Sequence, residues 1–164
     1  MKRTWVGVSV IVVAAALTGP AGADPLVNGG FETGDFTGWT LTNGYAPSVE
    51  PFHQGYSLPY YPMEGTYFAV LKLTLMQIDG LSQYVDLQAG DTLTGWVAAD
   101  AAHTSFYRVS MDGRSYEAIP FQNAIWDFGT LPISAPWQSW SWTAPAAGTY
   151  RVYCYVRRFT VLCG

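Results

Sequence analysis

Charged side chains are scarce in this 164-residue chain, where Asp, Glu, Lys and Arg together make up 12% of the sequence. Eight basic residues against twelve acidic ones give a formal net charge of −4. A nucleic-acid partner requires a basic surface that neutralises phosphates, so this balance argues against one. The polar surface must then come from Ser, Thr, Asn, Gln and Tyr, a composition common in extracellular β proteins and sugar binders.

Residues that usually carry catalysis or hold metals are also few. His53 and His103 lie far apart, and neither has a second His at i+2 or i+4 that would suggest a metal site. No G-x-S-x-G elbow occurs, although a Ser-His-Asp triad built from distant residues stays open. The acidic residues are scattered, without a pair spaced to aim two carboxyl groups into one groove as a glycosidase needs. These features favour a protein that is not an enzyme.

Cysteine is nearly absent, since Cys154 and Cys163 are the only two. Two lone Cys are a poor basis for a metal site. If Arg158-Phe159 forms a two-residue turn, Cys154 faces Cys163 on a non-hydrogen-bonded rung, where side chains approach most closely. The disulfide would close a loop of about ten residues and add roughly 2.7 kcal/mol on the chain-entropy relation. The alternative is two unpaired thiols, because Arg-Phe suits a primed turn poorly.

Long hydrophobic runs are missing everywhere except near the N-terminus. Lys2 and Arg3 precede an apolar run from about Trp5 to Leu17, and small residues follow up to Ala23. This pattern predicts a secretory signal peptide, with cleavage after Ala23. A membrane anchor is the alternative, but it needs about 20 apolar residues.

Export would leave residues 24–164 as a single domain without membrane insertion, of a size that can bury a proper core. Removal of residues 1–23 takes away two of the eight basic residues and none of the twelve acidic ones, so the net charge becomes −6. We therefore expect an acidic, secreted product.

Helical patterns are also missing after the signal, because no capped periodic segment of helical length occurs. Short runs of β-preferring residues recur instead, separated by turn residues. The predicted strands span Trp39–Thr42, Ser48–His53, Thr66–Leu73, Leu81–Leu87, Thr92–Asp100, Ser105–Met111, Ser115–Ile119, Pro136–Thr143 and Thr149–Arg157. Their number and spacing predict an all-β fold, a two-sheet antiparallel β-sandwich of the jelly-roll type.

The stretch N-G-G-F-E-T-G-D-F-T-G-W-T at residues 28–40 is rich in turn formers and aromatics. Gly, Asn and Asp tolerate positive φ, which tight turns require. Phe31, Phe36 and Trp39 lie between them, and such rings are costly to leave in water. We expect this segment, here called the clasp, to be a folded loop that opens the β domain.

The clasp motif N-G-G-F-E-T-G followed by G-W resembles the start of the galactose-binding-like jelly rolls, which include many carbohydrate-binding modules. It resembles still more closely the secreted bacterial proteins of the PEP-CTERM type. Three further pieces are similar to the same group: Leu81-Ser82-Gln83-x-Val85, Ala89-Gly90-Asp91-x-Leu93-x-Gly95-Trp96, and the run W-x-x-W-x-W-T-A-P-A-A-G-T-Y at residues 137–150. The resemblance implies that Trp39, Trp140 and Tyr150 are core residues. It bears on fold more than on function, since one fold hosts many activities.

The resemblance also implies a structural calcium. Domains of this group often hold the ion between the Glu of G-F-E and an Asp of the final strand. Glu32 supplies the first position, but no acidic residue follows Asp127. Calcium usually takes more than one carboxylate, so Glu32 is the single predicted ligand.

A glycan is the ligand class that the resemblance implies. Sugar rings stack on aromatic side chains while polar side chains bond their hydroxyls, the usual division in a binding site. The predicted ligand-binding residues are Trp96, Asp100, Tyr107, Arg108, Trp126 and Tyr153, with Trp96 and Asp100 on one strand face and Trp126 in a loop beside Gln122, Asn123 and Asp127. The Tyr-rich segment 55–65 is a further loop of the kind that touches ligands.

The leading interpretation is a secreted, non-catalytic protein that binds a polysaccharide or cell-surface glycan in a bacterial envelope or matrix. The alternative is an extracellular structural protein whose aromatics and strand edges pack against copies of the same chain. An enzyme is the third interpretation.

Overall fold

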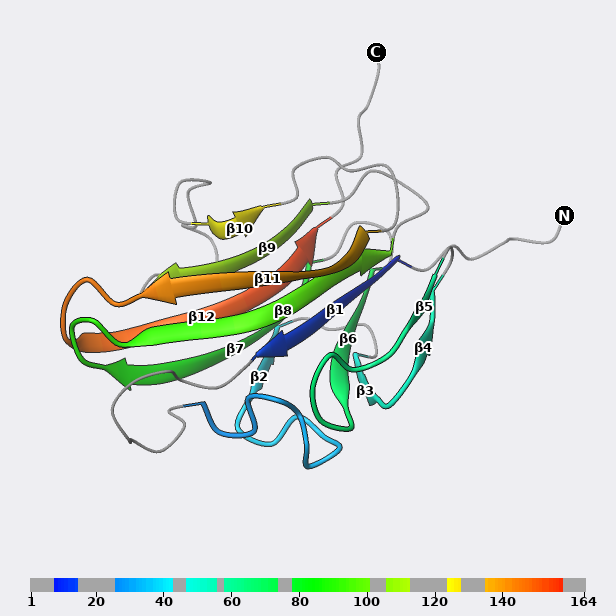
Figure 1. Cartoon of the computed structure of the whole chain (residues 1–164), viewed down its shortest axis with the longest axis horizontal. Coiled ribbons are helices and arrows are strands. Elements are labelled where there is room, and N and C mark those ends of the chain that lie inside the picture. The colour runs from blue at the N-terminus through cyan, green and yellow to red at the C-terminus, as the bar shows by residue number, and fades with distance from the viewer. Residues whose placement is uncertain are drawn as a thin grey trace, which may run out of the picture.

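The chain is seen in a computed structural model that describes residues 8–14, 26–42, 47–55, 58–73, 78–100, 106–112, 124–127 and 135–157. Within these ranges every regular element is a β-strand, and no helix long and apolar enough to cross a membrane is found. All strand pairs are antiparallel (Figure 1). The all-β prediction is therefore confirmed.

The strands form two larger sheets and a small ribbon. Sheet A has the order β11-β8-β1-β6-β3, with strands Ala135–Thr143 (β11), Thr92–Asp100 (β8), Val8–Ala14 (β1), Phe68–Leu73 (β6) and Ser48–Glu50 (β3). Sheet B has the order β10-β9-β12-β7-β2, with strands Ala124–Asp127 (β10), Phe106–Asp112 (β9), Gly148–Arg157 (β12), Ile78–Leu87 (β7) and Thr40–Thr42 (β2). The ribbon pairs His53–Gln54 (β4) with Pro59–Tyr60 (β5).

Most predicted strands are present with small shifts of their ends. The prediction for Thr92–Asp100 coincides with β8. The predicted strand Ser48–His53 is divided, because Pro51 and Phe52 separate β3 from β4, and Pro cannot donate to a ladder. The prediction for Ser115–Ile119 lies outside the described residues. Trp126 was predicted in a loop, and this is wrong, since it lies in β10.

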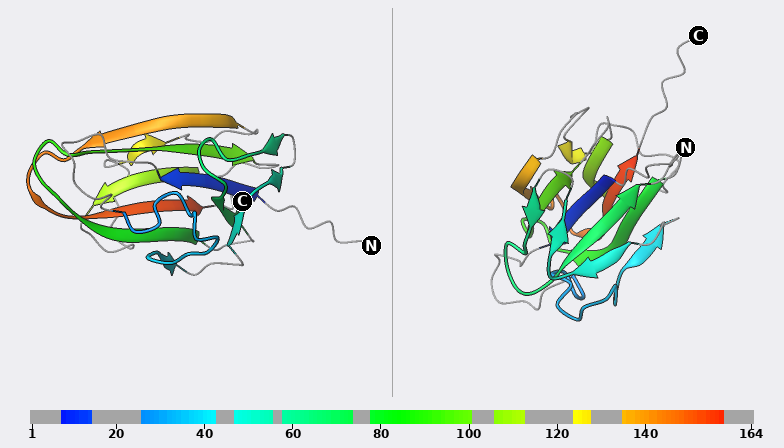
Figure 2. Two further views of the ribbon diagram at one scale, coloured as in Figure 1. Left: turned by 60° about the horizontal axis from the view of Figure 1, so that its bottom comes forward. Right: turned by 90° about the vertical axis from the view of Figure 1, so that its right-hand side faces the viewer.

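One strand occupies the apolar run that predicts a signal peptide. Val8–Ala14 forms β1, which lies between β6 and β8 in the middle of sheet A. Figure 2 shows this blue strand inside the array of strands and not at its border. Export and cleavage after Ala23 stay predictions, while the same run has a defined place in the sheet.

The main core draws residues from the clasp and from both sheets. Its buried members are Leu26, Phe31, Trp39, Ala69, Leu71, Leu81, Val85, Leu87, Leu93, Val97, Trp140, Ala144, Val152 and Cys154. Tyr150 is half-buried and packs against this core. The predicted core positions of Trp39 and Trp140 are thus confirmed, and each Leu buried here stabilises the fold by about 1.5–3 kcal/mol.

A second hydrophobic cluster covers the opposite face of sheet A. Phe68 and Val70 alternate along β6 with the core residues Ala69 and Leu71, so they face the other way. Tyr60 of the ribbon and Ala98 of β8 complete the buried cluster, and Trp96 and Trp137 pack against it. Both faces of β6 are therefore buried.

The clasp is folded as predicted, but its positive φ angles do not all fall on Gly, Asn or Asp. Positive φ angles occur at Gly34 (76°) and Gly38 (84°), and also at Asn28 (53°) and Phe31 (62°). Gly29 and Gly30 do not adopt such angles. A left-handed Phe is unusual and costs about 1–3 kcal/mol in backbone strain.

Packing of its ring holds Phe31 in this conformation. The side chain is fully buried, stacked on Trp39 with ring centroids 5.2 Å apart and in edge contact with Phe36 at 6.1 Å. The indole N–H of Trp39 donates to the carbonyl of Asn28 at 3.0 Å. Asn28 in turn bonds Thr33 through its side-chain oxygen.

Gln83 of β7 ties the clasp to sheet B. Its amide oxygen accepts from the backbone N–H of Val27 at 2.7 Å, and its amide nitrogen donates to the carbonyls of Val27 and Gly38, each at 2.9 Å. Gln83 shares the inner face of β7 with Leu81 and Val85. One buried side chain thus satisfies three backbone groups, two at Val27 just before the clasp and one at Gly38 near its end.

We expect Gln83→Leu to destabilise the protein by about 2–4 kcal/mol, because it leaves partly buried backbone groups of Val27 and Gly38 without partners. Urea unfolding of purified protein measures this loss. Gln88→Leu is the matched control, since Gln88 is exposed and should change stability by less than about 0.5 kcal/mol. Equal stability of the two variants would contradict the role of Gln83.

Candidate functional site

Two exposed aromatic rings meet at the ribbon. Phe52 immediately precedes β4 and Tyr61 immediately follows β5, so ribbon pairing brings them together. Their ring centroids lie 5.0 Å apart, with an angle of 48° between the rings. Phe52 is 41% exposed and Tyr61 is 62% exposed. We call these rings, together with the polar side chains of Glu50, His53 and Glu64 described below, the ribbon patch.

Two indoles of sheet A anchor the ribbon. The indole N–H of Trp137 donates to the carbonyl of Tyr61 at 2.9 Å, and its ring meets the edges of Tyr60 and Phe68. The indole N–H of Trp96 reaches the carboxylate of Glu64 at 3.4 Å. These bonds hold the backbone that carries the exposed rings. Binding a ligand there would therefore cost less conformational entropy of the protein.

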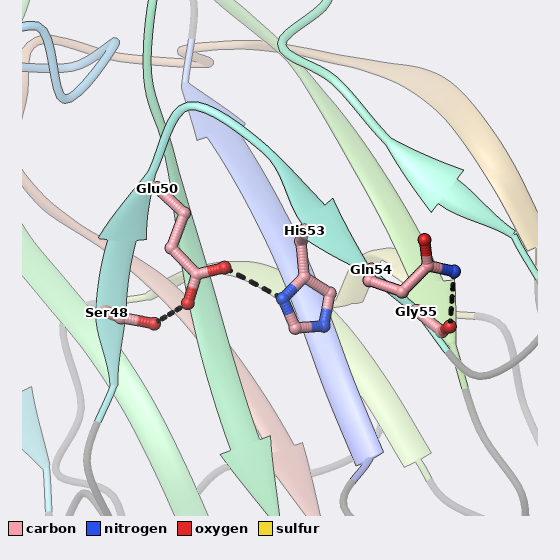
Figure 3. Close-up of polar contacts among 5 residues, drawn as sticks. All are labelled: Ser48, Glu50, His53, Gln54 and Gly55. Carbon is pink, nitrogen blue, oxygen red and sulfur yellow. Dashed lines mark hydrogen bonds and ion pairs between the residues drawn. The ribbon is translucent and has the colours of Figure 1, made fainter.

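An acid–imidazole pair, Glu50 and His53, flanks Pro51 and Phe52 in the sequence, and His53 pairs across the ribbon with the buried Tyr60. Nδ1 of His53 and Oε2 of Glu50 are 2.8 Å apart, and the hydroxyl of Ser48 donates to the same carboxylate (Figure 3). Both side chains of the pair remain partly exposed. The hydroxyl contacts the carboxylate and not the imidazole, so the three residues lack the order of a nucleophilic triad, in which His lies between the other two. Their geometry suits the binding of polar groups.

The residues predicted to bind a ligand are divided between the two larger sheets. Trp96 and Asp100 lie on β8 of sheet A, whereas the other four lie on three adjacent strands of sheet B: Tyr107 and Arg108 on β9, Trp126 on β10 and Tyr153 on β12. Trp96 is half-buried and contacts the ribbon patch through Glu64. The structure gives strand positions for Asp100, Tyr107, Arg108 and Trp126, but their side chains lie outside the described parts.

Tyr153 is buried and presents no surface to a ligand in this structure, so its role in binding stays a prediction. Its side chain is 0% exposed. The guanidinium of Arg151 lies 4.6 Å from the ring centroid. Gly80 on the neighbouring strand makes room for the ring, because a Cβ there would lie 2.7 Å from Tyr153 Cε2. The alternation of side chains along a strand predicts which residues share a face of the sheet. It does not show whether the outer face is exposed to solvent.

Sheet B carries its own exposed aromatic, Tyr84, which is 63% exposed. The guanidinium of Arg151 lies 5.9 Å from its ring centroid and donates to the hydroxyl of Ser82 at 3.0 Å. Among the described side chains Tyr84 has no aromatic neighbour comparable to the Phe52–Tyr61 pair. It offers a smaller surface than the ribbon patch.

Glu32, the predicted calcium ligand, links the clasp by hydrogen bonds to the segment before β6. Its Oε1 accepts from the backbone N–H groups of Thr66 (2.9 Å) and Tyr67 (3.1 Å), and its Oε2 from Thr66 (3.0 Å). No group of three or more His, Cys, Asp or Glu that could hold a metal is found among the residues that the structure covers. Calcium binding at Glu32 stays a prediction.

Cys154 lies at the centre of sheet B as a buried free thiol. It pairs with Leu81 of β7 on one side and Val109 of β9 on the other. Both edges of β12 are therefore occupied at this residue, and the hairpin rung from which the disulfide was predicted is not formed there. Cys163 lies outside the described residues, so the disulfide itself stays untested.

Comparisons with known proteins assign no family to this chain. No protein-family model matches it, and neither curated proteins nor solved structures give a significant match. The function must therefore be argued from the residues themselves.

We expect Glu32→Ala to lower stability by about 1–2 kcal/mol, because two backbone N–H groups lose their charged acceptor. Glu32→Gln should lose less, since its amide oxygen still accepts. Thermal melting with calcium and with a chelator separates this role from metal binding, because an ion that binds only the native state raises its melting temperature. A melting temperature that calcium raises in both wild type and Glu32→Ala would exclude Glu32 as its ligand.

Burial raises the pKa of the Cys154 thiol from 9.0 to about 12. This contribution to stability is complete below pH 9 and is lost as the pH rises towards 12, because only the unfolded thiol ionises in that window; the slope is about 1.4 kcal/mol per pH unit. In a Cys163→Ser background, Cys154 should not react with a disulfide reagent at pH 8 until guanidinium unfolds the protein. The variant Cys154→Ala should lose this part of the alkaline slope in urea unfolding. Rapid native reactivity would contradict the burial.

Proposed function

We propose that this protein is exported and binds a polysaccharide or cell-surface glycan through the ribbon patch, without catalysing a reaction. The observation that carries the proposal is the contact between the exposed rings of Phe52 and Tyr61. Two adjoining rings offer an apolar platform of the size on which pyranose C–H faces stack, and partly exposed polar side chains lie near the rings in the sequence.

Polar side chains of the ribbon patch and its neighbour Gln54 supply the donors and acceptors that sugar hydroxyls need. The carboxylates of Glu50 and Glu64 accept hydrogen bonds, and His53 and the exposed amide of Gln54 can donate or accept. Each of these groups already has a fixed partner: Glu50 with His53, Glu64 with Trp96, and Gln54 with the carbonyl of Gly55. Held side chains lose little freedom on binding, which favours specific recognition.

The finer fold assignment belongs to the same proposal. We take sheets A and B as the two layers of a jelly-roll sandwich of the galactose-binding-like type. Support comes from residues of both sheets in one core and from the clasp motif N-G-G-F-E-T-G, which packs into that core through Phe31 and Trp39. Export to a bacterial envelope or matrix fits the leader-like N-terminal sequence and the scarcity of charge.

Self-assembly is the second candidate, and the border of sheet A favours it. β11 is a nine-residue outer strand whose sequence, A-P-W-Q-S-W-S-W-T, contains no charged residue. Long outer strands without Lys or other charges can pair with further copies of a chain. β3, at the other border, has only three residues and offers much less.

A binding assay with matched variants tests the glycan proposal. Wild-type protein is applied to a glycan array and to insoluble cellulose, chitin and xylan. We expect Tyr61→Ala and Phe52→Ala each to weaken binding to the retained glycan at least tenfold, a loss of about 1.4 kcal/mol. Tyr84→Ala is the control, because it removes an equally exposed ring from sheet B and should bind as wild type does.

Two results would count against the proposal. If Tyr61→Ala and Tyr84→Ala bind equally well, the platform is elsewhere. If no glycan is retained and sedimentation shows concentration-dependent assembly that a Lys at Ser139 or Ser141 of β11 abolishes, the structural candidate is favoured instead. Both serines are exposed, so these substitutions leave the core intact.

A further inference from the structure

The strand β1 is held from both sides by β6 and β8. Five of its residues pair with β6, from Val8 opposite Leu73 to Val12 opposite Ala69. Six pair with β8, from Ser9 opposite Asp100 to Ala14 opposite Gly95. β6 and β8 are neighbours of β1 and not of each other, so this strand alone joins the two halves of sheet A.

The surroundings of β1 require an apolar strand. Opposite its middle lie Ala69 and Val70 on β6 and Val97 and Ala98 on β8, all of them buried. One residue of each pair belongs to the main core and the other to the second cluster, so both faces of the sheet are covered here. Strands buried on both faces have almost continuous apolar sequences, and V-S-V-I-V-V-A meets that requirement.

The predicted cleavage point lies between this strand and the rest of the fold. β1 ends at Ala14, and Leu26, two residues before the clasp, is buried in the main core. Cleavage after Ala23 would therefore break the covalent connection without cutting either the strand or the clasp. Cleavage would leave a domain with a gap in sheet A and a separate peptide that contains the strand filling that gap.

We propose that the channel between β6 and β8 is a binding site for one apolar β-strand, and that residues 8–14 of this chain are its ligand. The strand binds antiparallel to both neighbours in the register given above. Loss of this peptide after cleavage would expose the facing edges of β6 and β8 and the core beneath them. The proposal concerns sheet A alone and does not depend on glycan binding.

The test uses the full chain with a thrombin site placed in the segment 16–23. The protein is produced inside the cell so that the leader is retained, then folded, purified and cut. We expect the fragment carrying residues 8–14 to co-elute with the domain in size-exclusion chromatography. A fluorescent synthetic peptide of residues 6–16 should exchange into the cut protein, and the same peptide with Ile11→Pro should bind at least tenfold more weakly, because Pro removes an N–H and disrupts the ladder.

Substitutions in the uncut chain supply an independent readout. Ile11→Pro should lower the melting temperature by about 10 °C or more, since Pro is not tolerated within a central strand. The matched control Ile11→Val keeps a β-branched strand residue and should shift it by only a few degrees. If Ile11→Pro does not fold, the exchange experiment on the cut wild-type sequence decides.

Two outcomes would overturn the proposal. The first is a cut protein that releases the fragment, keeps the melting temperature of the uncut chain and takes up neither peptide. The second is equal binding of the wild-type and Ile11→Pro peptides, which would show adhesion without strand pairing. Co-elution of the fragment, or selective uptake of the wild-type peptide after its loss, supports the site.

Discussion

The fold depends on a single amide group that closes the clasp over sheet B. Gln83 points inward from β7 among Leu and Val side chains, a position that would be costly for a polar group without partners. It is retained there because Val27 and Gly38 provide one N–H and two carbonyls at hydrogen-bonding distance. The clasp can then cover the core with Phe31 in a strained conformation, since the energy lost in the backbone is recovered in ring packing.

Much of the fold was predictable because strand alternation is a local property. The sequence 92–100 alternates between residues that enter the main core and residues that enter the second cluster, and its strand was predicted to the residue. β1 was not predicted as a strand, since an uninterrupted apolar run is equally typical of an export signal and of a strand covered on both faces. The burial of Tyr153 was not predictable for a related reason, because alternation along a strand does not show what covers its outer face.

The candidate site was predicted only in part. The Tyr-rich segment 55–65 indicates a loop suited to ligands, and the strand pattern points to Trp96, but no sequence pattern singles out Phe52. Its importance arises from pairing between β4 and β5, which brings it to Tyr61 across the ribbon. A hairpin of two-residue strands leaves almost no periodic signal in a sequence, so contacts of this kind emerge only from the three-dimensional arrangement.

The position of β12 has a consequence for how the polypeptide matures. This strand, the last one described, lies in the middle of sheet B, with β7 on one side and β9 on the other. Neither β7 nor β9 can pair with β12 until the chain has been synthesised as far as Arg157, so sheet B is completed late and through contacts distant in sequence. Until then β7 and β9 each have one unpaired edge, and unpaired strand edges are where growing chains aggregate or bind chaperones.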